Sequence, residues 1–293
     1  MVRKKRPPLP ILQILFLVIL ICFGALFYYF WQNGKFGKFD RFNLILQGTP
    51  VILVSLDPKE HSVTVVRFPD DLYVLEVVPN YGAYKMASVY KVGELDRRGG
   101  LVLSWTVSGL LGVPVDGYLV VNRRIGAQIK SFFLSPRILF DSPSDLNFFD
   151  RVRFVLALEQ VRFDKINEVD LGKMATALVL ADGSAVLGVD KEQLDSLFAG
   201  YFGETGLREE GKRVEVLNST PVVGLGNRAA RVLTNIGLSV INVGSISDTL
   251  SQCEVRTNNI KSLTVRRMAN IFSCKIITRA VEDRADVTLV LSK

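Results

Sequence analysis

The stretch VILVSLDPKEHSVTVVRF, residues 51–68, decides how the central part of this chain folds. Its two halves, VILVSLD and SVTVVRF, are rich in β-branched residues and flank the polar turn sequence DPKEHS, which is typical of a β-hairpin. Residues 99–111 carry apolar side chains at helical spacing, and we expect Trp105 in the core. Residues 117–122, GYLVVN, predict a further strand. The order strand, strand, helix, strand predicts a mixed α/β fold for residues 45–205.

The second half of this region contains mostly helix-forming residues. We expect a helix over residues 154–161 and further helices over 166–171, 173–180 and 187–202. An Asp-Gly pair lies between the last two of these expected helices and separates them. The mostly polar segment 203–211, which begins and ends with glycine, predicts a boundary between domains.

Residues 212–293 predict a small second domain. The strand-like segments KRVEVLNS, SVINVGS, EVRTNN and ADVTLVLSK alternate with amphipathic segments at 221–238 and 262–274. The order is β-α-β-β-α-β, the split βαβ arrangement, and we expect both helices on one face of the sheet. Cys253 and Cys274 also lie in this domain. They are either a disulfide pair, in an oxidising compartment, or two small apolar core residues.

Residues 9–31 contain no charged side chain. A helix of about 20 residues spans the ~30 Å apolar core of a bilayer, and aromatic residues at one end, here YYFW, are typical of the membrane interface. The basic residues at positions 3–6 predict that residues 1–8 are cytoplasmic and that the chain after residue 32 lies outside. The apolar run is longer than that of a cleaved signal peptide and lacks a small-residue cleavage site. We therefore expect an uncleaved single-pass anchor in the cell membrane, followed by a linker over 32–44.

The chain of 293 residues has a formal net charge of +7 and a pI of about 9.3. Outside the basic tail the positive charges are spread along the sequence, so we expect no nucleic acid partner, and the cytoplasmic tail is too short to bind DNA. A small positive net charge on the part of the chain outside the cell favours anionic wall polymers or lipid head groups as partners. The single His61 has no Cys or His neighbour in sequence and does not predict a zinc site.

Three segments of the middle domain together resemble the LytR-CpsA-Psr family. Residues 68–74, FPDDLYV, resemble the Pro-x-Asp corner that follows a hairpin in this family. Residues 85–90, KMASVY, and 110–119, LLGVPVDGYL, match two further family segments in order and spacing. The segments VEVLNST, at 214–220, and ADVTLVLSK, at 285–293, resemble the start and the end of the LytR C-terminal domain.

Members of this family are membrane-anchored proteins outside the cell that transfer polyprenyl-pyrophosphate-linked glycopolymers onto peptidoglycan. The resemblance implies a catalytic and metal-binding role for Asp71, and phosphate-binding roles for Lys85, Arg151 and Arg153. Each of these residues also has a simpler interpretation, as a carboxylate that caps a turn or a cation on a solvated surface. No cofactor is expected, with magnesium bound only if transferase activity is retained. The expected partners are the lipid bilayer and either peptidoglycan or an anionic wall polymer.

Two departures from the family pattern bear on this chemistry. Asp70 occupies the place of the arginine in the family's Pro-Arg-Asp corner, and residues 150–154, DRVRF, only partly match the family's arginine-rich helix start. A pyrophosphate needs converging cations, which an added carboxylate opposes. We therefore expect a non-catalytic binding or scaffold module with a degenerate transferase fold; the alternative is an active glycopolymer–peptidoglycan phosphotransferase. Convergence of the four implied site residues on one cleft would favour the enzyme, and their dispersal would favour binding.

Overall fold

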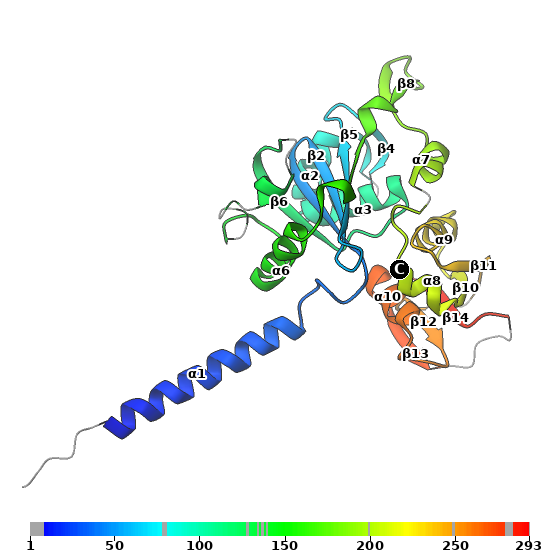
Figure 1. The fold of residues 1–293 in the computed structure, drawn as a ribbon. Helices are drawn as coiled ribbons and strands as arrows, with labels where there is room; N and C mark the ends of the chain where they lie inside the picture. Colours follow the sequence, from blue (N-terminus) through cyan, green and yellow to red (C-terminus); the bar gives the residue numbers. More distant parts are fainter. Residues whose placement is uncertain are drawn as a thin grey trace, which may run out of the picture.

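The computed structural model of this protein describes residues 9–77, 81–126, 129–133, 135, 138, 140–198, 200–247, 250–278 and 284–292. Within these residues the chain forms helix α1 (Leu9–Gln32), a larger α/β domain and a smaller C-terminal α/β domain. Figure 1 shows α1 projecting from the body at the lower left, with the C-terminal domain at the lower right.

The larger domain is built on a five-stranded sheet with the order β6-β1-β2-β3-β7. Its strands are β1 (Phe42–Thr49), β2 (Val51–Asp57), β3 (Ser62–Phe68), β6 (Gly117–Arg124) and β7 (Ile166–Asp170). The predicted hairpin over 51–68 is confirmed as β2 and β3, which pair antiparallel with Val51 opposite Phe68. β1 also pairs antiparallel with β2, whereas β6 and β7 add parallel at the two edges.

Both faces of this sheet are buried. In β1, Leu44 and Leu46 enter one hydrophobic cluster and Ile45 enters another, because successive side chains of a strand point to opposite faces. The first face is covered by α4 (Ile129–Phe133) and α6 (Phe148–Glu159). The second face is covered by α2 (Met86–Glu94), α3 (Gly99–Leu111) and α7 (Lys191–Phe198). A sheet covered on both faces needs nearly continuous apolar strands, which explains the run VILVSL in β2.

The region after α6 differs from the prediction. Its elements, together with the other short ones of this domain, are β4 (Tyr73–Val77), β5 (Gly82–Lys85), η1 (Phe163–Lys165), η2 (Leu171–Lys173), β8 (Thr176–Val179) and β9 (Ala185–Gly188). The next helix, α8 (Thr205–Glu210), packs in the core of the C-terminal domain through Leu207. The helices predicted over 166–171 and 173–180 are wrong, because these residues form β7 and β8. The helix predicted over 187–202 is correct only within α7.

The physical reason lies in the partners of these strands. β7 completes the central sheet by pairing in parallel with the free edge of β3. β8 and β9 pair antiparallel around an Asp-Gly turn in which Gly183 has a φ of +83°, a conformation that glycine adopts without strain. Asp-Gly between two short apolar runs is a hairpin signal, and here it outweighs the helical propensity of the flanking residues.

The C-terminal domain contains a second five-stranded sheet, with the order β11-β10-β14-β12-β13. Its elements are β10 (Arg213–Asn218), α9 (Leu225–Asn235), β11 (Ser239–Ser245), β12 (Glu254–Thr257), α10 (Leu263–Phe272), β13 (Lys275–Thr278) and β14 (Val287–Leu291). Both helices pack on the same face, where Leu233, Val265 and Leu289 share one cluster. The predicted β-α-β-β-α-β order is therefore confirmed, with β13 as an additional edge strand.

Helix α1 exposes its apolar side chains. From Ile14 to Leu26 its large apolar residues are 49% to 70% exposed. Counting only the residues that the structure describes, no helix is both long and apolar enough to cross a membrane. The membrane-spanning role of residues 9–31 therefore stays a prediction.

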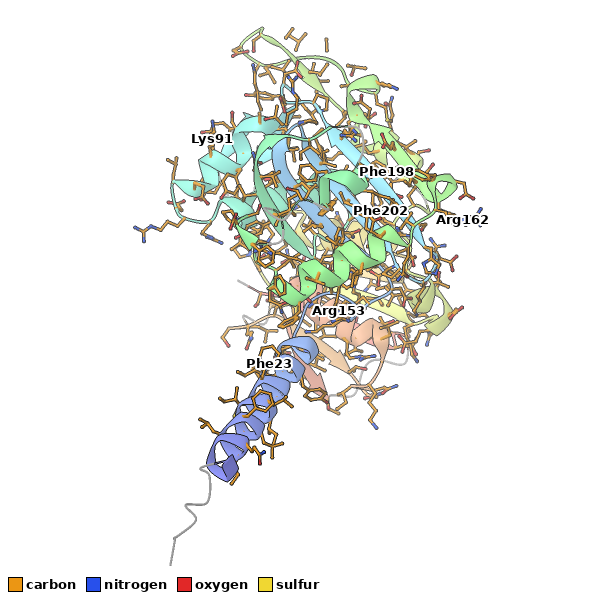
Figure 2. All side chains as sticks on the ribbon, turned by 60° about the vertical axis from the view of Figure 1, so that its left-hand side comes forward. Phe23, Lys91, Arg153, Arg162, Phe198 and Phe202 are labelled. Carbon is orange, nitrogen blue, oxygen red and sulfur yellow. A yellow bond between two sulfur atoms is a disulfide. The ribbon has the colours of Figure 1, made fainter. Side chains whose placement is uncertain are left out.

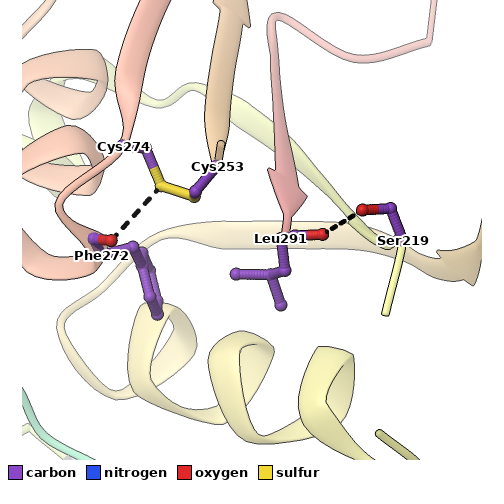
Figure 3. The surroundings of a disulfide bond; sticks show 5 residues. All are labelled: Ser219, Cys253, Phe272, Cys274 and Leu291. Atoms are coloured by element: carbon purple, nitrogen blue, oxygen red, sulfur yellow. Dashed lines mark hydrogen bonds between the residues drawn. A yellow bond between two sulfur atoms is a disulfide. The ribbon is translucent and has the colours of Figure 1, made fainter. Parts of the chain in front are cut away.

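Cys253 and Cys274 form a disulfide, which decides between the two alternatives that the sequence left open. Figure 3 shows the bond between the residue before β12 and the turn after α10. The Lys275 N–H donates to the Cys253 carbonyl oxygen at 2.9 Å, so the cross-link stands beside the pairing of β12 and β13. In the same view, Ser219 Oγ donates to the Leu291 carbonyl oxygen at 2.7 Å and ties β10 to β14.

Removal of this disulfide should destabilise the C-terminal domain. The bond closes a loop with a sequence separation of 21 residues, for which the loss of unfolded-chain entropy amounts to about 3 kcal/mol. We expect a variant with both Cys253→Ser and Cys274→Ser to lose about 2–4 kcal/mol in free energy of unfolding. Denaturant unfolding of the full chain in detergent measures this, with Cys22→Ser as the control. Equal unfolding midpoints for the double variant and the control would contradict the prediction.

Candidate functional site

Two of the predicted site residues lie at the corner that follows β3. Asp71 is exposed in the turn between β3 and β4, and Lys85 is the exposed last residue of β5. The Met86 N–H donates to the Leu72 carbonyl oxygen at 2.7 Å, and both of these neighbouring side chains are buried. The structure therefore brings Asp71 and Lys85 to one corner of the larger domain.

The two predicted arginines lie on α6 and are engaged by other parts of the protein. Arg151 donates from Nε to the Leu146 carbonyl oxygen and from Nη1 to that of Ile138, both at 3.3 Å. The Arg153 guanidinium lies 5.7 Å from the centre of the Phe36 ring, a cation–π contact. Both arginine side chains are half-buried and help to hold α6 in place.

The central sheet separates these two pairs. The corner with Asp71 packs on the face covered by α2 and α3, at the end where β3 finishes. α6 packs on the opposite face, and its Phe154 meets Phe42, the first residue of β1, at the other end. The four residues therefore do not share one cleft. The roles assigned to them stay predictions.

Asp71 was also expected to bind magnesium. This cation takes an octahedral set of oxygen ligands, of which the protein usually supplies one or two carboxylates and the substrate phosphates supply others. In the part of the chain that the structure describes, no three His, Cys, Asp or Glu side chains come together as a metal-binding group. The metal-binding role of Asp71 therefore stays a prediction.

A groove of about 280 Å³ lies between α3 and the C-terminal end of α10, where the two domains meet. α3 contributes Leu101, Trp105 and Ser108, which share one side of the helix. The core position expected for Trp105 is wrong: its side chain is 39% exposed, because neighbouring positions of α3 fill the core instead. The Arg98 guanidinium lies 4.9 Å from the Trp105 ring centre. Ser104 of α3 also lines the groove. The other lining residues come from the linker, the segments around β6, and the C-terminal end of α10; they are Lys35, Pro114, Val115, Asp116, Asp145, Asn270, Ile271 and Ser273.

The charged groups of this groove are paired across segments that lie far apart in the sequence. Lys35 Nζ lies 2.5 Å from Asp145 Oδ2, and Asp116 Oδ1 lies 2.5 Å from Arg267 Nη1. The groove therefore combines an aromatic ring, hydroxyl and amide groups, and carboxylates whose charge is balanced by nearby cations.

Arg267 of α10 is the fully buried centre of the contact between the domains. Its guanidinium donates from Nη1 to Asp116 at 2.5 Å and from Nε to Glu204 at 2.7 Å. It also lies 4.5 Å from the ring centre of Phe39, in the linker after α1. One side chain of the C-terminal domain thereby binds three segments of the rest of the chain. Its pairing is essential, because desolvating a buried ion costs several kcal/mol.

A second arginine fixes the same two domains. Arg231 of α9 donates to both oxygens of the Asp195 carboxylate of α7 at 2.7–2.9 Å. It also donates to the carbonyl oxygens of Gly109 and Leu110, at 2.9 and 3.1 Å, in the last turn of α3 where a cation is favourable. Gly112 ends α3 with a φ of 66°, and a Cβ there would lie 2.6 Å from a side-chain amide of α9. The walls of the groove are therefore fixed by specific contacts.

Glu204 lies in an unusual environment for a carboxylate. It is 1% exposed, and its Oε2 has no hydrogen-bond partner among the atoms that the structure describes. Burial raises the pKa of Glu204 to about 7; Arg267 opposes this rise and Asp116 adds to it. Burial alone would lower the pKa of Arg267, but its two carboxylate partners outweigh burial and raise it. Glu204 therefore changes its charge near neutral pH while Arg267 stays protonated.

Residues 212–293 match the protein family described as LytR cell envelope-related transcriptional attenuator. This part of the chain is a LytR C-terminal domain. The predicted relation to LytR-type proteins of the cell envelope is therefore confirmed, at the residues where the sequence motifs placed it. The family match includes Arg231 and Arg267, so both arginines that bind the larger domain belong to the LytR C-terminal domain.

Several solved structures are similar to this chain. TagT of B. subtilis is 13% identical, with a TM-score of 0.40 over 55% of this chain and 89% of that one. TagV of B. subtilis is 12% identical, with a TM-score of 0.41 over 54% and 94%. A transcriptional regulator of Enterococcus faecalis is 12% identical, with a TM-score of 0.43 over 68% and 89%. No curated protein matches this chain in sequence.

Loss of the Arg267 side chain should uncouple the domains and destabilise the protein. Arg267→Ala leaves Asp116 and Glu204 without their cation, and we expect a loss of about 3–5 kcal/mol in free energy of unfolding. Arg266→Ala removes an exposed arginine from the same helix, and it should cost less than about 0.5 kcal/mol. Urea unfolding of the full chain in detergent compares the two variants, and equal stabilities would contradict the role of Arg267.

The stability should also depend on pH through Glu204. Its pKa is about 7 in the folded protein against an ordinary value of 4.5. Because the folded state binds more protons between these values, the stabilisation is complete at low pH and is lost as pH rises through 7. The loss amounts to about 3 kcal/mol between about pH 4.5 and about pH 8. Glu204→Gln does not titrate, so urea unfolding should show this pH dependence in the parent chain and not in the variant. Parallel pH profiles would show the assignment to be wrong.

Proposed function

We propose that this chain is a single-pass envelope protein that binds a glycan outside the cell and does not catalyse polymer transfer. In this proposal residues 9–31 cross the membrane, residues 1–8 lie in the cytoplasm, and both α/β domains lie outside. The observation that carries the proposal is the groove between α3 and α10, whose side chains suit a saccharide.

The anchor is supported by the apolar sequence of residues 9–31 and by the basic residues at positions 3–6. The described side chains of α1 are exposed, as expected of a helix that lipid surrounds. The proposed span also takes in residues of α1 whose side chains lie outside the described set. The disulfide between Cys253 and Cys274 fits an oxidising compartment outside the cytoplasm.

The placement of the charged residues supports a role without transfer. Transfer from a polyprenyl pyrophosphate requires cations that converge on the phosphate groups. Arg151 and Arg153 lie across the central sheet from Asp71 and Lys85. Asp70 adds a negative charge at the corner where the family carries an arginine. Loss of one well-placed donor costs about 100–1000-fold in rate, and a carboxylate in its place adds repulsion.

The composition of the groove supports a saccharide ligand. An aromatic ring such as that of Trp105 packs against the C–H face of a sugar, while amide and carboxylate groups such as those of Asn270 and Asp116 pair with its hydroxyls. The volume of about 280 Å³ lies near the lower end of the range for ligand sites, about 300–1,000 Å³. A groove of this size suits a short oligosaccharide segment.

The charge balance of the groove favours an uncharged sugar over an anionic polymer. Asp145 is neutralised by Lys35, and Asp116 is neutralised by the buried Arg267. A phosphate group in the groove would face both carboxylates at close range and would have to displace one of these pairs. The glycan strand of peptidoglycan is therefore a better candidate partner than an anionic wall polymer.

Tryptophan fluorescence tests this proposal directly, because the chain has two tryptophans and one of them lines the groove. In a Trp31→Phe variant of the full chain, Trp105 is the single tryptophan. We expect a saturable change in its emission on titration with N-acetylglucosamine oligosaccharides. In the same background, Asn270→Ala should weaken binding about tenfold, and Asn258→Ala, an exposed asparagine away from the groove, should leave it unchanged.

Three results would contradict the proposal. The glycan assignment fails if the emission of Trp105 does not respond to the oligosaccharides, or if Asn270→Ala and Asn258→Ala bind equally well. The non-catalytic assignment fails if the protein, supplied with lipid-linked oligosaccharide, peptidoglycan fragments and magnesium, forms a covalent product that Asp71→Ala abolishes.

A further inference from the structure

The outer side of α6 carries apolar residues where a surface helix usually carries polar ones. Phe148 and Leu156 are 43% and 58% exposed, and Val152 lies half-buried between them at a spacing of four residues. Phe140, 67% exposed, stacks on Phe148 with ring centres 5.3 Å apart. The inner side of the helix already fills the core through Phe154. Phe140, Phe148, Val152 and Leu156 are called the α6 patch below.

The α6 patch is held close to the end of α1. The buried carboxylate of Asp150, in the first turn of α6, accepts hydrogen bonds from the backbone N–H groups of Lys35 at 2.9 Å and Phe36 at 3.0 Å. Gly34 allows this approach, since a Cβ there would lie 2.3 Å from Asp150 Oδ1. α1 ends at Gln32, so the intervening residues place the start of α6 within roughly 10 Å of the helix end.

Both views of the fold show this proximity. In Figure 1, α1 reaches the body beside α6, and in Figure 2 the labelled Arg153 of α6 lies next to the upper end of α1. Tyr28 and Tyr29 near the end of α1 are 65% and 60% exposed. Amphipathic aromatic residues of this kind prefer the level of the lipid head groups. The start of α6 therefore lies close to the level at which α1 would leave a bilayer.

We propose that the α6 patch lies in the interface of the same bilayer that holds α1, as a second membrane contact of this protein. The proposal rests on the anchor of the proposed function. A helix that lies in the membrane plane buries its apolar side a few ångströms into the boundary between head groups and acyl chains. Phe140, Phe148 and Leu156 are large, exposed apolar side chains that gain free energy from such burial.

The surrounding charges indicate that apolar burial drives this contact. Arg153 of α6 and Lys130 are cations close to the patch, and the exposed acids Asp141 and Glu159 follow Phe140 and Leu156 by one and three residues. Lys130 Nζ already donates to the Glu159 carbonyl oxygen at 3.1 Å. This mixture is too balanced for strong attraction to anionic lipids, so the contact should persist in bilayers of zwitterionic phosphatidylcholine.

The contact would also set the position of the groove. Lys35, which lines the groove, lies three residues beyond the end of α1 and next to the hydrogen bonds that hold α6. With both α1 and the α6 patch in the bilayer, the larger domain has two points of attachment and cannot rotate freely about its linker. The groove then stays close to the membrane surface.

Quenching of a fluorescent label by spin-labelled lipid tests the proposal in the full chain. The chain is placed in phosphatidylcholine nanodiscs that carry nitroxide at a shallow or a deep position. A label at Phe148→Cys, in a Cys22→Ser background with the native disulfide intact, should be quenched by the shallow nitroxide. A label at Val223→Cys, a 93% exposed residue of the C-terminal domain, is the matched control and should not be quenched. A label on Cys22 of the parent chain reports on α1 and should respond to the deep nitroxide.

A further variant separates insertion from mere nearness to α1. Phe140→Ser together with Leu156→Ser should reduce the quenching of the label at position 148 by about half or more, because the apolar surface that holds it in the bilayer is lost. Quenching at Cys22 without quenching at position 148 overturns the second contact and leaves the anchor intact. Quenching at position 148 that the double substitution does not change likewise overturns it. Loss of quenching at both Cys22 and position 148 overturns the anchor and the contact together.

Discussion

The guanidinium of Arg267, buried between Asp116 and Glu204, is the interaction on which the arrangement of this protein depends. It stands at the point where α10, the segment that leads into β6 and the linker after α1 meet. A buried ion of this kind gains little net stability over apolar packing, but it strongly penalises any arrangement that leaves it unpaired. The two carboxylates therefore specify one orientation of the domains. The raised pKa of Glu204 makes the net charge of this cluster sensitive to pH near neutrality.

The linker is part of the same interface and does not act as a loose tether. Lys35 pairs with Asp145, and the ring of Phe39 lies over Arg267. The Asp40 carboxylate accepts a hydrogen bond from the Gly206 N–H at 2.7 Å, which joins the linker to α8. The segment that connects α1 to the first strand is thus fixed to both domains.

Much of the fold could be predicted from the sequence, because the relevant signals are local. The hairpin at 51–68 has two β-branched runs and a polar turn, and the C-terminal domain has helices and strands whose apolar periodicity is clear. The helix predicted over 166–171 is wrong because β7 is short and draws its stability from a partner, β3, that is remote in the sequence. Local propensity contains no information about such a partner.

The candidate site was harder to predict, for a similar reason. Trp105 sits on a helix that is apolar on most sides, and its exposure depends on which side meets the sheet. Arg267 directly follows another arginine on α10, and of the two only Arg267 is buried. The helical spacing indicates that the two side chains point in different directions. Which of them is buried depends on the neighbouring domain. Asp71 and the arginines of α6 were grouped by family motif. α6 lies on the opposite face of the sheet, and this feature of the tertiary structure cannot be read from the motif.

The position of the LytR C-terminal domain has a consequence for function. It docks at the end of the central sheet where β6 begins, which is the end opposite the corner with Asp71 and Lys85. The groove that it completes is therefore a different surface from the corner where the family motif lies. α3 alone offers an exposed tryptophan on a convex helix, and α10 alone offers an amide beside a turn. A concave site exists only when Arg267 and Arg231 hold the two domains together. A ligand bound in the groove and the docking of the domains would therefore stabilise each other by the same free energy.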